Sequence, residues 1–205
     1  MIGIRLVFLA STMTIVSVAL SGQQLLDRIV ARVNGIAITL TDVSAAVALG
    51  IADLPESAAI QQLVDRQLVL SEVARFVPPE PAAAAVEAEV GSLTTRAGAH
   101  LREIMVSTGI DEAGIREIAR ENLRIQAYLN QRFGANVQLT EEEVARYYRI
   151  HPEEFTRGGM LLPFTEAEPV ARERASAERR ALTVSQWMRD LRARAEISRP
   201  NELAN

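Results

Sequence analysis

A short segment near the beginning of the chain constrains its fold most, because it has the pattern of two strands joined by a tight turn. Between Asp27 and Thr41 apolar and polar side chains alternate, and Asn34-Gly35 interrupts the alternation. Alternation of this kind is typical of β-strands, and both turn residues tolerate the positive φ that a type I′ turn requires. We therefore expect a β-hairpin. Because an isolated hairpin is marginally stable in water, a third strand or a helix is needed to cover it.

The other strand candidate lies at the far end of the chain, at residues 195–199, and is ended by Pro200. Pairing of these segments would bring both ends of the ordered chain into one sheet, with a long helical excursion between them. Hydrophobic residues make up 48% of the chain but aromatic residues only 4%, so Ala, Val, Leu and Ile must form most of the core. The expected fold is mainly α, a multi-helix domain with a small antiparallel sheet formed by the N-terminal hairpin and a C-terminal strand.

Apolar periodicity and capping residues divide the intervening chain into helices. The expected helical spans are about 42–49, 55–76, 82–97, 100–107, 111–133, 140–150 and 165–194. The 55–76 helix is apolar around most of its surface and should be central. Thr41-Asp42, Thr140 and Thr165 are the expected caps, the last two each preceding a Glu by three positions. Residues 77–81 should form a turn between helices, with an interdomain linker as the alternative, and residues 155–163 should be irregular.

The last helix carries an apolar stripe with near-heptad spacing. Its members are Val170, Ala177, Ala181, Val184, Met188, Leu191 and Ala195. This spacing fits a coiled-coil contact with a second helix, and it also fits packing against the body of the protein, which is the simpler interpretation.

The N-terminus and the overall charge limit the classes of function. Residues 1–21 combine one positive charge, an apolar stretch and small residues near its end, which is typical of a secretory signal peptide. A membrane anchor formed by residues 6–20 is the alternative. The net charge of -4 provides no basic field for binding nucleic acid. The absence of cysteine excludes disulfides and thiolate chemistry.

No motif in the sequence predicts catalysis. His100 and His151 lie outside any HExxH pattern, and no serine lies in a GxSxG context. Glu141, Glu142 and Glu143 follow a capping threonine, where carboxylates favour the helix dipole, so capping explains them better than a metal site does. We therefore expect no catalytic residue, no metal and no cofactor.

Several segments resemble the SurA-type periplasmic chaperones and parvulin foldases, specifically their non-catalytic helical domain. The matching segments, in the family's order, are DRIVARVNGIAITLTDV, LVDRQLVLSEVARF, GIDEAGIREIARENLRIQAYLNQRF, VQLTEEEVARYYRIHPEEF and QWMRDLRARAEI. The resemblance covers nearly the whole chain after the signal peptide. It implies a chaperone domain at 22–155 and a C-terminal helix and strand at 165–200 that complete the same domain.

The chain departs from the family in one respect. Family members usually carry one or two parvulin-type prolyl isomerase domains before the C-terminal helix, whereas here residues 156–164 provide only a short connection. Such a connection is far too short for a domain. Peptidyl-prolyl isomerase activity is therefore the least favoured of the functions considered.

The resemblance implies a periplasmic holdase that binds unfolded or outer-membrane-bound polypeptides, without nucleic acid or a small-molecule substrate. Apolar side chains around a groove would suit such broad specificity. The candidate peptide-binding residues are Tyr147, Tyr148, Phe155, Met160, Leu161 and Trp187. The alternative is an assembly module of the cell envelope that pairs through its last helix, as a homodimer or with another envelope protein.

Overall fold

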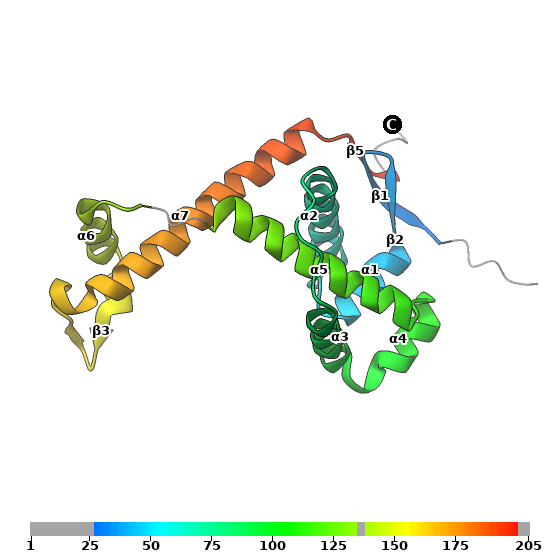
Figure 1. Cartoon of the computed structure of the whole chain (residues 1–205), viewed down its shortest axis with the longest axis horizontal. Helices are drawn as coiled ribbons and strands as arrows, with labels where there is room; N and C mark the ends of the chain where they lie inside the picture. The colour runs from blue at the N-terminus through cyan, green and yellow to red at the C-terminus, as the bar shows by residue number, and fades with distance from the viewer. Residues whose placement is uncertain (1–26, 135–137, 201–205) are drawn as a thin grey trace, which may run out of the picture.

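The computed structural model describes residues 27–134 and 138–200, so the predicted signal peptide lies outside the described residues. Strands β1 (Ile29–Val33) and β2 (Ile36–Thr39) form the expected hairpin, and β5 (Ile197–Ser198) pairs with β1. The three strands are antiparallel in the order β2-β1-β5. Asn34 and Gly35 have φ values of 50° and 84°, as a type I′ turn requires. The mainly helical fold, with a small sheet joining both ends of the chain, is therefore confirmed (Figure 1).

Five helices follow the hairpin and form the body of the protein with the sheet. They are α1 (Leu40–Ala48), α2 (Glu56–Arg75), α3 (Ala83–Ala97), α4 (Leu101–Thr108) and α5 (Glu112–Phe133). Helix α2 packs against the sheet, α1, α5 and the last helix of the chain, so its predicted central position is confirmed. Residues 77–81 form a turn between α2 and α3, and α3 and α5 enclose a second apolar cluster around Leu93 and Ile115.

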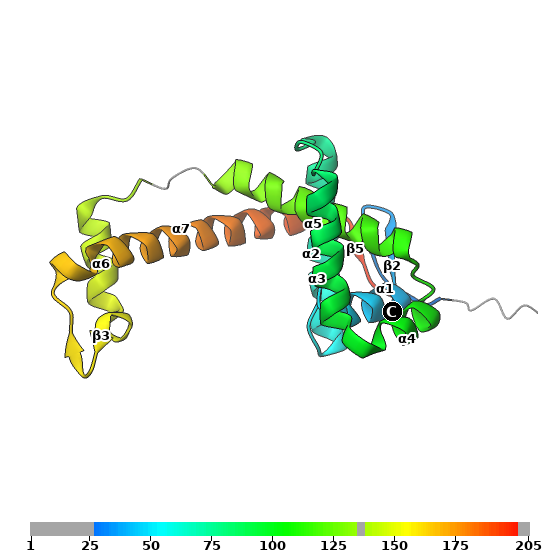
Figure 2. The ribbon, with the colours of Figure 1, turned by 60° about the horizontal axis from the view of Figure 1, so that its bottom comes forward.

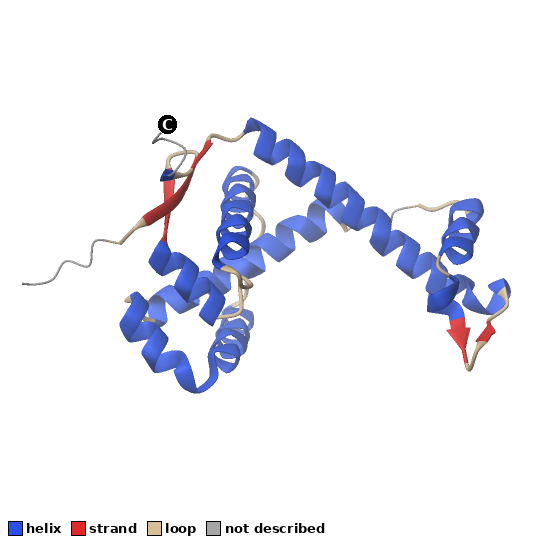
Figure 3. Ribbon diagram, turned by 180° about the vertical axis from the view of Figure 1, so that it is seen from behind, coloured by secondary structure: helices blue, strands red, loops and turns tan. Residues whose placement is uncertain are grey.

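The remaining elements form what we call the distal module, residues 138–182, which lies away from this body (Figure 2). It contains α6 (Glu141–Ile150), the 3₁₀ turn η2 (Pro152–Phe155), and the short strands β3 (Thr156–Arg157) and β4 (Met160–Leu161). The first half of α7 (Phe164–Arg194) completes it. Val144, Phe155 and Ala171 lie at the centre of its apolar core. The same helix then continues to the body, where β5 follows it (Figure 3).

Only part of the apolar stripe of helix α7 packs against the body, because Val170, Ala177 and Ala181 are exposed. At its C-terminal end Val184, Met188 and Leu191 pack into the cluster beneath the sheet, as expected for packing against the body. Near its start a different set, Ala167, Ala171 and Ala175, packs against α6, and their small side chains permit close approach. Between these regions the helix is mostly exposed to solvent. None of the helices in the described part of the chain is both long and apolar enough to cross a membrane.

Several predicted details of local structure are wrong. Helix α1 is capped by Thr39, whose side chain forms a capping box with Asp42, and not by Thr41. Helix α7 begins after Pro163 without a side-chain cap, so Thr165 is not its N-cap. Residues 155–163 are more ordered than expected, because Gly158 and Gly159 both adopt positive φ and turn β3 back onto β4.

Candidate functional site

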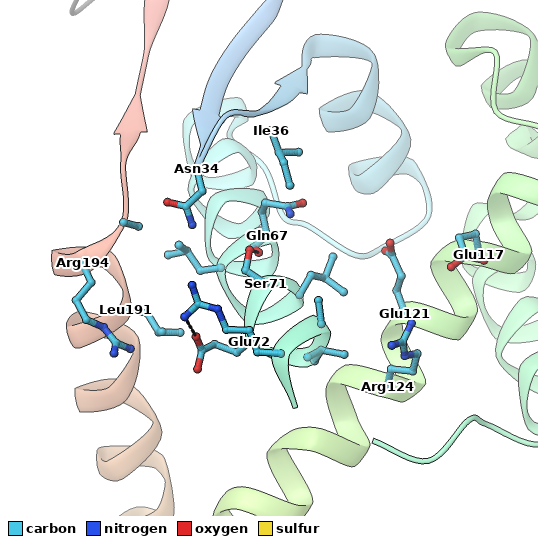
Figure 4. A pocket seen from close by; sticks show the side chains of 16 residues that line it. Asn34, Ile36, Gln67, Ser71, Glu72, Glu117, Glu121, Arg124, Leu191 and Arg194 are labelled. Atoms are coloured by element: carbon cyan, nitrogen blue, oxygen red, sulfur yellow. Dashed lines mark hydrogen bonds and ion pairs between the residues drawn. The ribbon is translucent and has the colours of Figure 1, made fainter. Parts of the chain in front are cut away.

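A groove runs along the outer edge of the sheet in the body of the protein. Strand β2 forms one wall, α5 the opposite wall and α2 the floor, and the end of α7 lies at one end (Figure 4). Two cavities of about 750 and 390 Å³ make up the groove, and both are lined by Gln67, Leu70 and Glu121. The groove therefore extends along β2 from the hairpin turn to the start of α1.

Three glutamates along this groove each have an arginine partner, and the Asp42 carboxylate accepts hydrogen bonds from Thr39. Glu72, the one buried charged residue in the described part of the chain, is 3.3 Å from the Arg75 guanidinium. Glu121 accepts a hydrogen bond of 2.9 Å from Arg66, which comes from α2. Glu117 pairs with Arg120 on its own helix. Arg120 also pairs with Glu80, at 3.1 Å, so it is shared between two carboxylates.

Two arginines that line the larger cavity have no carboxylate partner among the described residues. Arg124 projects from α5, and its Nε atom is buried without a hydrogen-bond partner in that part of the chain. Arg194 belongs to the last turn of α7, and its Nε donates only to the backbone oxygen of Asp190, at 3.2 Å. The groove thus has an uncompensated positive charge at its α5 and α7 sides (Figure 4).

A second surface of interest lies on the distal module. Met160 is 76% exposed and Leu161 49% exposed, both on the small β3–β4 hairpin. Ile150, Val170 and Leu182 are also exposed on this module. Half of the ten large apolar side chains exposed in residues 27–134 and 138–200 therefore lie on the module, although it is the smaller part of the described chain.

The structure divides the predicted peptide-binding residues between exposed and buried positions. Met160 and Leu161 are exposed, whereas Tyr147 and Phe155 are buried in the distal core and Tyr148 is partly buried beside them. The Tyr148 hydroxyl donates a hydrogen bond of 2.6 Å to the backbone oxygen of Leu162, which ties α6 to the chain after the hairpin. In the free chain these three aromatic side chains support the module from within.

Trp187 is separated from the other candidates, because it lies in the body. It is buried between α5 and the sheet cluster, with ring centroids 6.0 Å from Tyr128 and 5.2 Å from Phe133. The Arg132 guanidinium lies 5.5 Å from the centroid of its ring. Trp187 therefore anchors α7 to the body.

Tyr147 shows how the distal core combines burial with hydrogen bonding. Its hydroxyl donates to the carboxylate of Glu154 at 3.1 Å, and Arg174 of α7 donates to the same carboxylate at 3.0 Å. Burial, followed by the neighbouring Glu154, raises the pKa of the Tyr147 hydroxyl above its ordinary value. The phenol therefore remains a hydrogen-bond donor throughout the physiological pH range.

A histidine and two carboxylates lie close together after α6. His151 Nδ1 is 3.5 Å from Glu153 and 4.0 Å from Glu154. Glu154 already accepts hydrogen bonds from Tyr147 and Arg174, and the His151 ring lies 4.3 Å from the Tyr147 ring. The group is thus part of the hydrogen bonding and packing that join α6 to α7.

Sequence reasoning missed the groove altogether. Its residues come from separate segments of the chain, so no local motif marks it. One signal was present nonetheless. A hairpin that receives a single additional strand must leave one of its own strands at the edge of the sheet, and here that strand is β2.

Comparisons with known proteins provide no identification of the chain. No protein-family model matches it, and a search of curated proteins finds no match. The two surfaces described above, together with the sequence resemblance, are the basis for the function proposed below.

Proposed function

We propose that this chain is a non-catalytic chaperone module of the periplasm that holds unfolded or outer-membrane-bound polypeptides. The resemblance of five segments to the helical domain of SurA-type chaperones supports this proposal. In place of a parvulin domain, residues 156–163 form only a short hairpin and the start of the connection to α7. Prolyl isomerase activity is accordingly not part of the proposal.

The observation that carries the proposal is the concentration of exposed apolar side chains on the distal module. Met160 and Leu161 lie at the end of the module, on a two-stranded hairpin whose strands pair only with each other in the described structure. Exposed apolar surface is costly in water and is commonly found where a protein binds a partner. A methionine suits contacts with varied sequences, because its side chain is unbranched and polarisable.

The test is aggregation of an unfolded outer-membrane protein, measured by light scattering with and without the purified mature chain. We expect suppression at stoichiometric concentrations, with no acceleration of prolyl isomerisation in a parallel peptide assay. Unchanged aggregation would contradict the holdase function. Accelerated isomerisation would show that a catalytic site exists without a parvulin domain.

The second candidate function is an assembly module, and the exposed middle of α7 favours it. Leu182 is exposed there, with Ala177 and Ala181 nearby on the same helix. Val184, Met188 and Leu191 already pack against the body, so a second helix could not use that face without displacing the body. Sedimentation of wild type and Leu182→Glu separates the candidates, because a stable dimer lost on substitution would favour assembly over client holding.

A further inference from the structure

We propose that the groove between β2 and α5 binds an extended polypeptide segment, which pairs with the free edge of β2 and directs an acidic side chain toward Arg124. The inference rests on the proposed function and deepens it. It names a site on the body where the client binds, and the kind of client segment that fits this site. It concerns a surface separate from the distal module.

The first argument is the hydrogen-bonding state of the β2 edge. The Val33–Ile36 pair flanks the two-residue turn and is therefore hydrogen-bonded, so the next pair, Arg32–Ala37, is not. The backbone N–H and C=O of Ala37 consequently point away from β1, toward the open edge of the sheet. Beyond Ala37, the Thr39 N–H is already taken by the Asp42 carboxylate, at 2.8 Å. The edge thus offers one donor and one acceptor, both from Ala37.

The second argument is the space beside that edge. The larger cavity is lined by Ile36 and the smaller one by Ala37 and Ile38, so together they follow three of the four residues of β2. An extended segment opposite the four residues of β2 would occupy about 13 Å at about 3.3 Å per residue. Leu70 on the floor is apolar and Gln67 is polar, which suits the alternating side chains of a strand.

The third argument is charge, and it selects the segment. The groove's glutamates pair with Arg75, Arg66 and Arg120, whereas Arg124 and Arg194 form no ion pair in the described residues. Arg124 lines the larger cavity, so its guanidinium is a candidate partner for an acidic ligand there. A carboxylate from a bound segment would supply a charge-assisted hydrogen bond. An acidic side chain within an extended apolar segment fits both the edge and the charge.

Binding of a labelled peptide to the full mature chain tests this inference. The peptide alternates apolar and polar residues with a central Glu, a second peptide carries Gln instead, and affinity is measured by fluorescence anisotropy. We expect the Glu peptide to bind more tightly. Loss of a charge-assisted hydrogen bond should reduce the affinity of Arg124→Gln for it by about tenfold. Arg149→Gln is the matched control, because Arg149 is an exposed arginine of α6, distant from the groove.

Two variants test the position of the peptide. Ala37→Pro removes the outward N–H but no bond of the β1–β2 ladder, and proline is tolerated at such edge positions. Gln67→Trp fills the stretch that both cavities share and leaves the sheet untouched. We expect both variants to weaken peptide binding while circular dichroism stays that of the wild type. If Ala37→Pro fails to fold, Gln67→Trp still decides the question.

The outcomes distinguish this inference from the proposed function. Wild-type affinity in both groove variants, or absence of peptide binding by a chain that suppresses aggregation, would overturn the inference and leave the holdase function standing. Peptide binding blocked by Gln67→Trp, without suppression of aggregation, would support the groove and contradict the holdase function. A wild-type dimer that Ala37→Pro converts to a monomer would overturn the inference, because the edge would then belong to a second copy.

Discussion

Asn34 and Glu196 are joined by two hydrogen bonds although 162 positions separate them in the sequence. The Asn34 N–H donates to the Glu196 backbone oxygen at 2.8 Å, and the Glu196 N–H donates to Asn34 Oδ1 at 3.0 Å. Asn34 is also the first residue of the hairpin turn, with φ of 50°. One residue therefore shapes the N-terminal hairpin and holds the C-terminal strand beside it.

This double role predicts the effect of replacing Asn34 with glycine. Glycine adopts positive φ without strain, so Asn34→Gly should leave the turn intact and remove only the acceptor for Glu196. We expect a loss of about 1 kcal/mol in the free energy of unfolding and faster amide hydrogen exchange at Ile197 and Ser198.

Asn34→Asp is the matched control, because aspartate keeps the side-chain oxygen and also tolerates this backbone conformation. Its β5 amides should exchange more slowly than those of the glycine variant. Equal exchange in the two variants would show that the side-chain acceptor does not hold β5.

The same residues explain why the fold could be predicted from sequence. Asn34-Gly35 within an alternating segment specifies the hairpin locally, and the need to cover it leads to the C-terminal strand. The Thr39 cap was missed because Thr39 also ends β2, where its strand pattern concealed its capping role. The β3–β4 hairpin was missed because strands of two residues are too short to show any alternation.

The candidate site was less predictable, since exposure depends on tertiary packing. Met160 and Phe155 were both predicted to bind peptide because of their apolar side chains. Met160 is exposed, whereas Phe155 is buried beneath α7. Neither fact follows from local pattern. The unpaired state of Arg124 depends on where the glutamates of other segments lie, and the sequence does not specify those positions.

Trp187 should account for much of the attachment of α7 to the body. Truncation of a buried tryptophan leaves a large cavity, so we expect Trp187→Ala to lower the free energy of unfolding by about 3–5 kcal/mol. Urea unfolding followed by circular dichroism measures the loss. Trp187→Phe should lose less, because it keeps an aromatic ring and removes an indole N–H that lacks a partner in the described residues.

Leu182→Ala provides the control on the same helix. Leu182 is exposed, and its truncation should change stability by less than about 0.5 kcal/mol. A similar loss in the Leu182 and Trp187 alanine variants would contradict the prediction, because burial of Trp187 against the body would then not account for the effect.

The exposed hairpin residues should matter for client binding and not for folding. We expect Met160→Ser with Leu161→Ser to weaken suppression of aggregation, because it removes apolar contact surface, while thermal unfolding stays close to that of the wild type. Val77→Ser with Val106→Ser is the matched control, since both valines are exposed on the body and line neither cavity of the groove. Undiminished suppression by the hairpin variant would remove the distal module from the proposed function.

The contact between α6 and α7 should weaken in acid through Glu143. Its carboxylate accepts the Thr140 N–H at 2.9 Å and pairs with Arg179 of α7. The pKa of Glu143 lies below its ordinary value of 4.5. The main cause is the hydrogen bond from the Thr140 backbone N–H, and the second is the hydrogen bond from Arg179. A carboxyl group whose pKa is lower when folded stabilises the native state above its unfolded pKa. That contribution is lost as the pH falls below 4.5 and through the folded value.

Amide hydrogen exchange in α6, measured between pH 6 and pH 3 and corrected for the intrinsic pH dependence of exchange, tests this expectation. We expect protection of α6 to fall across the acid range in the wild type. In Glu143→Gln protection should be lower at pH 6 and change less on acidification, because the amide can still accept the Thr140 N–H but carries no charge. Glu142→Gln is the control, since Glu142 is exposed and makes only a surface pair with Arg146 at 3.5 Å. Identical acid profiles in the wild type and Glu143→Gln would mean that other carboxylates, among them Glu154 between Tyr147 and Arg174, determine the acid stability of the module.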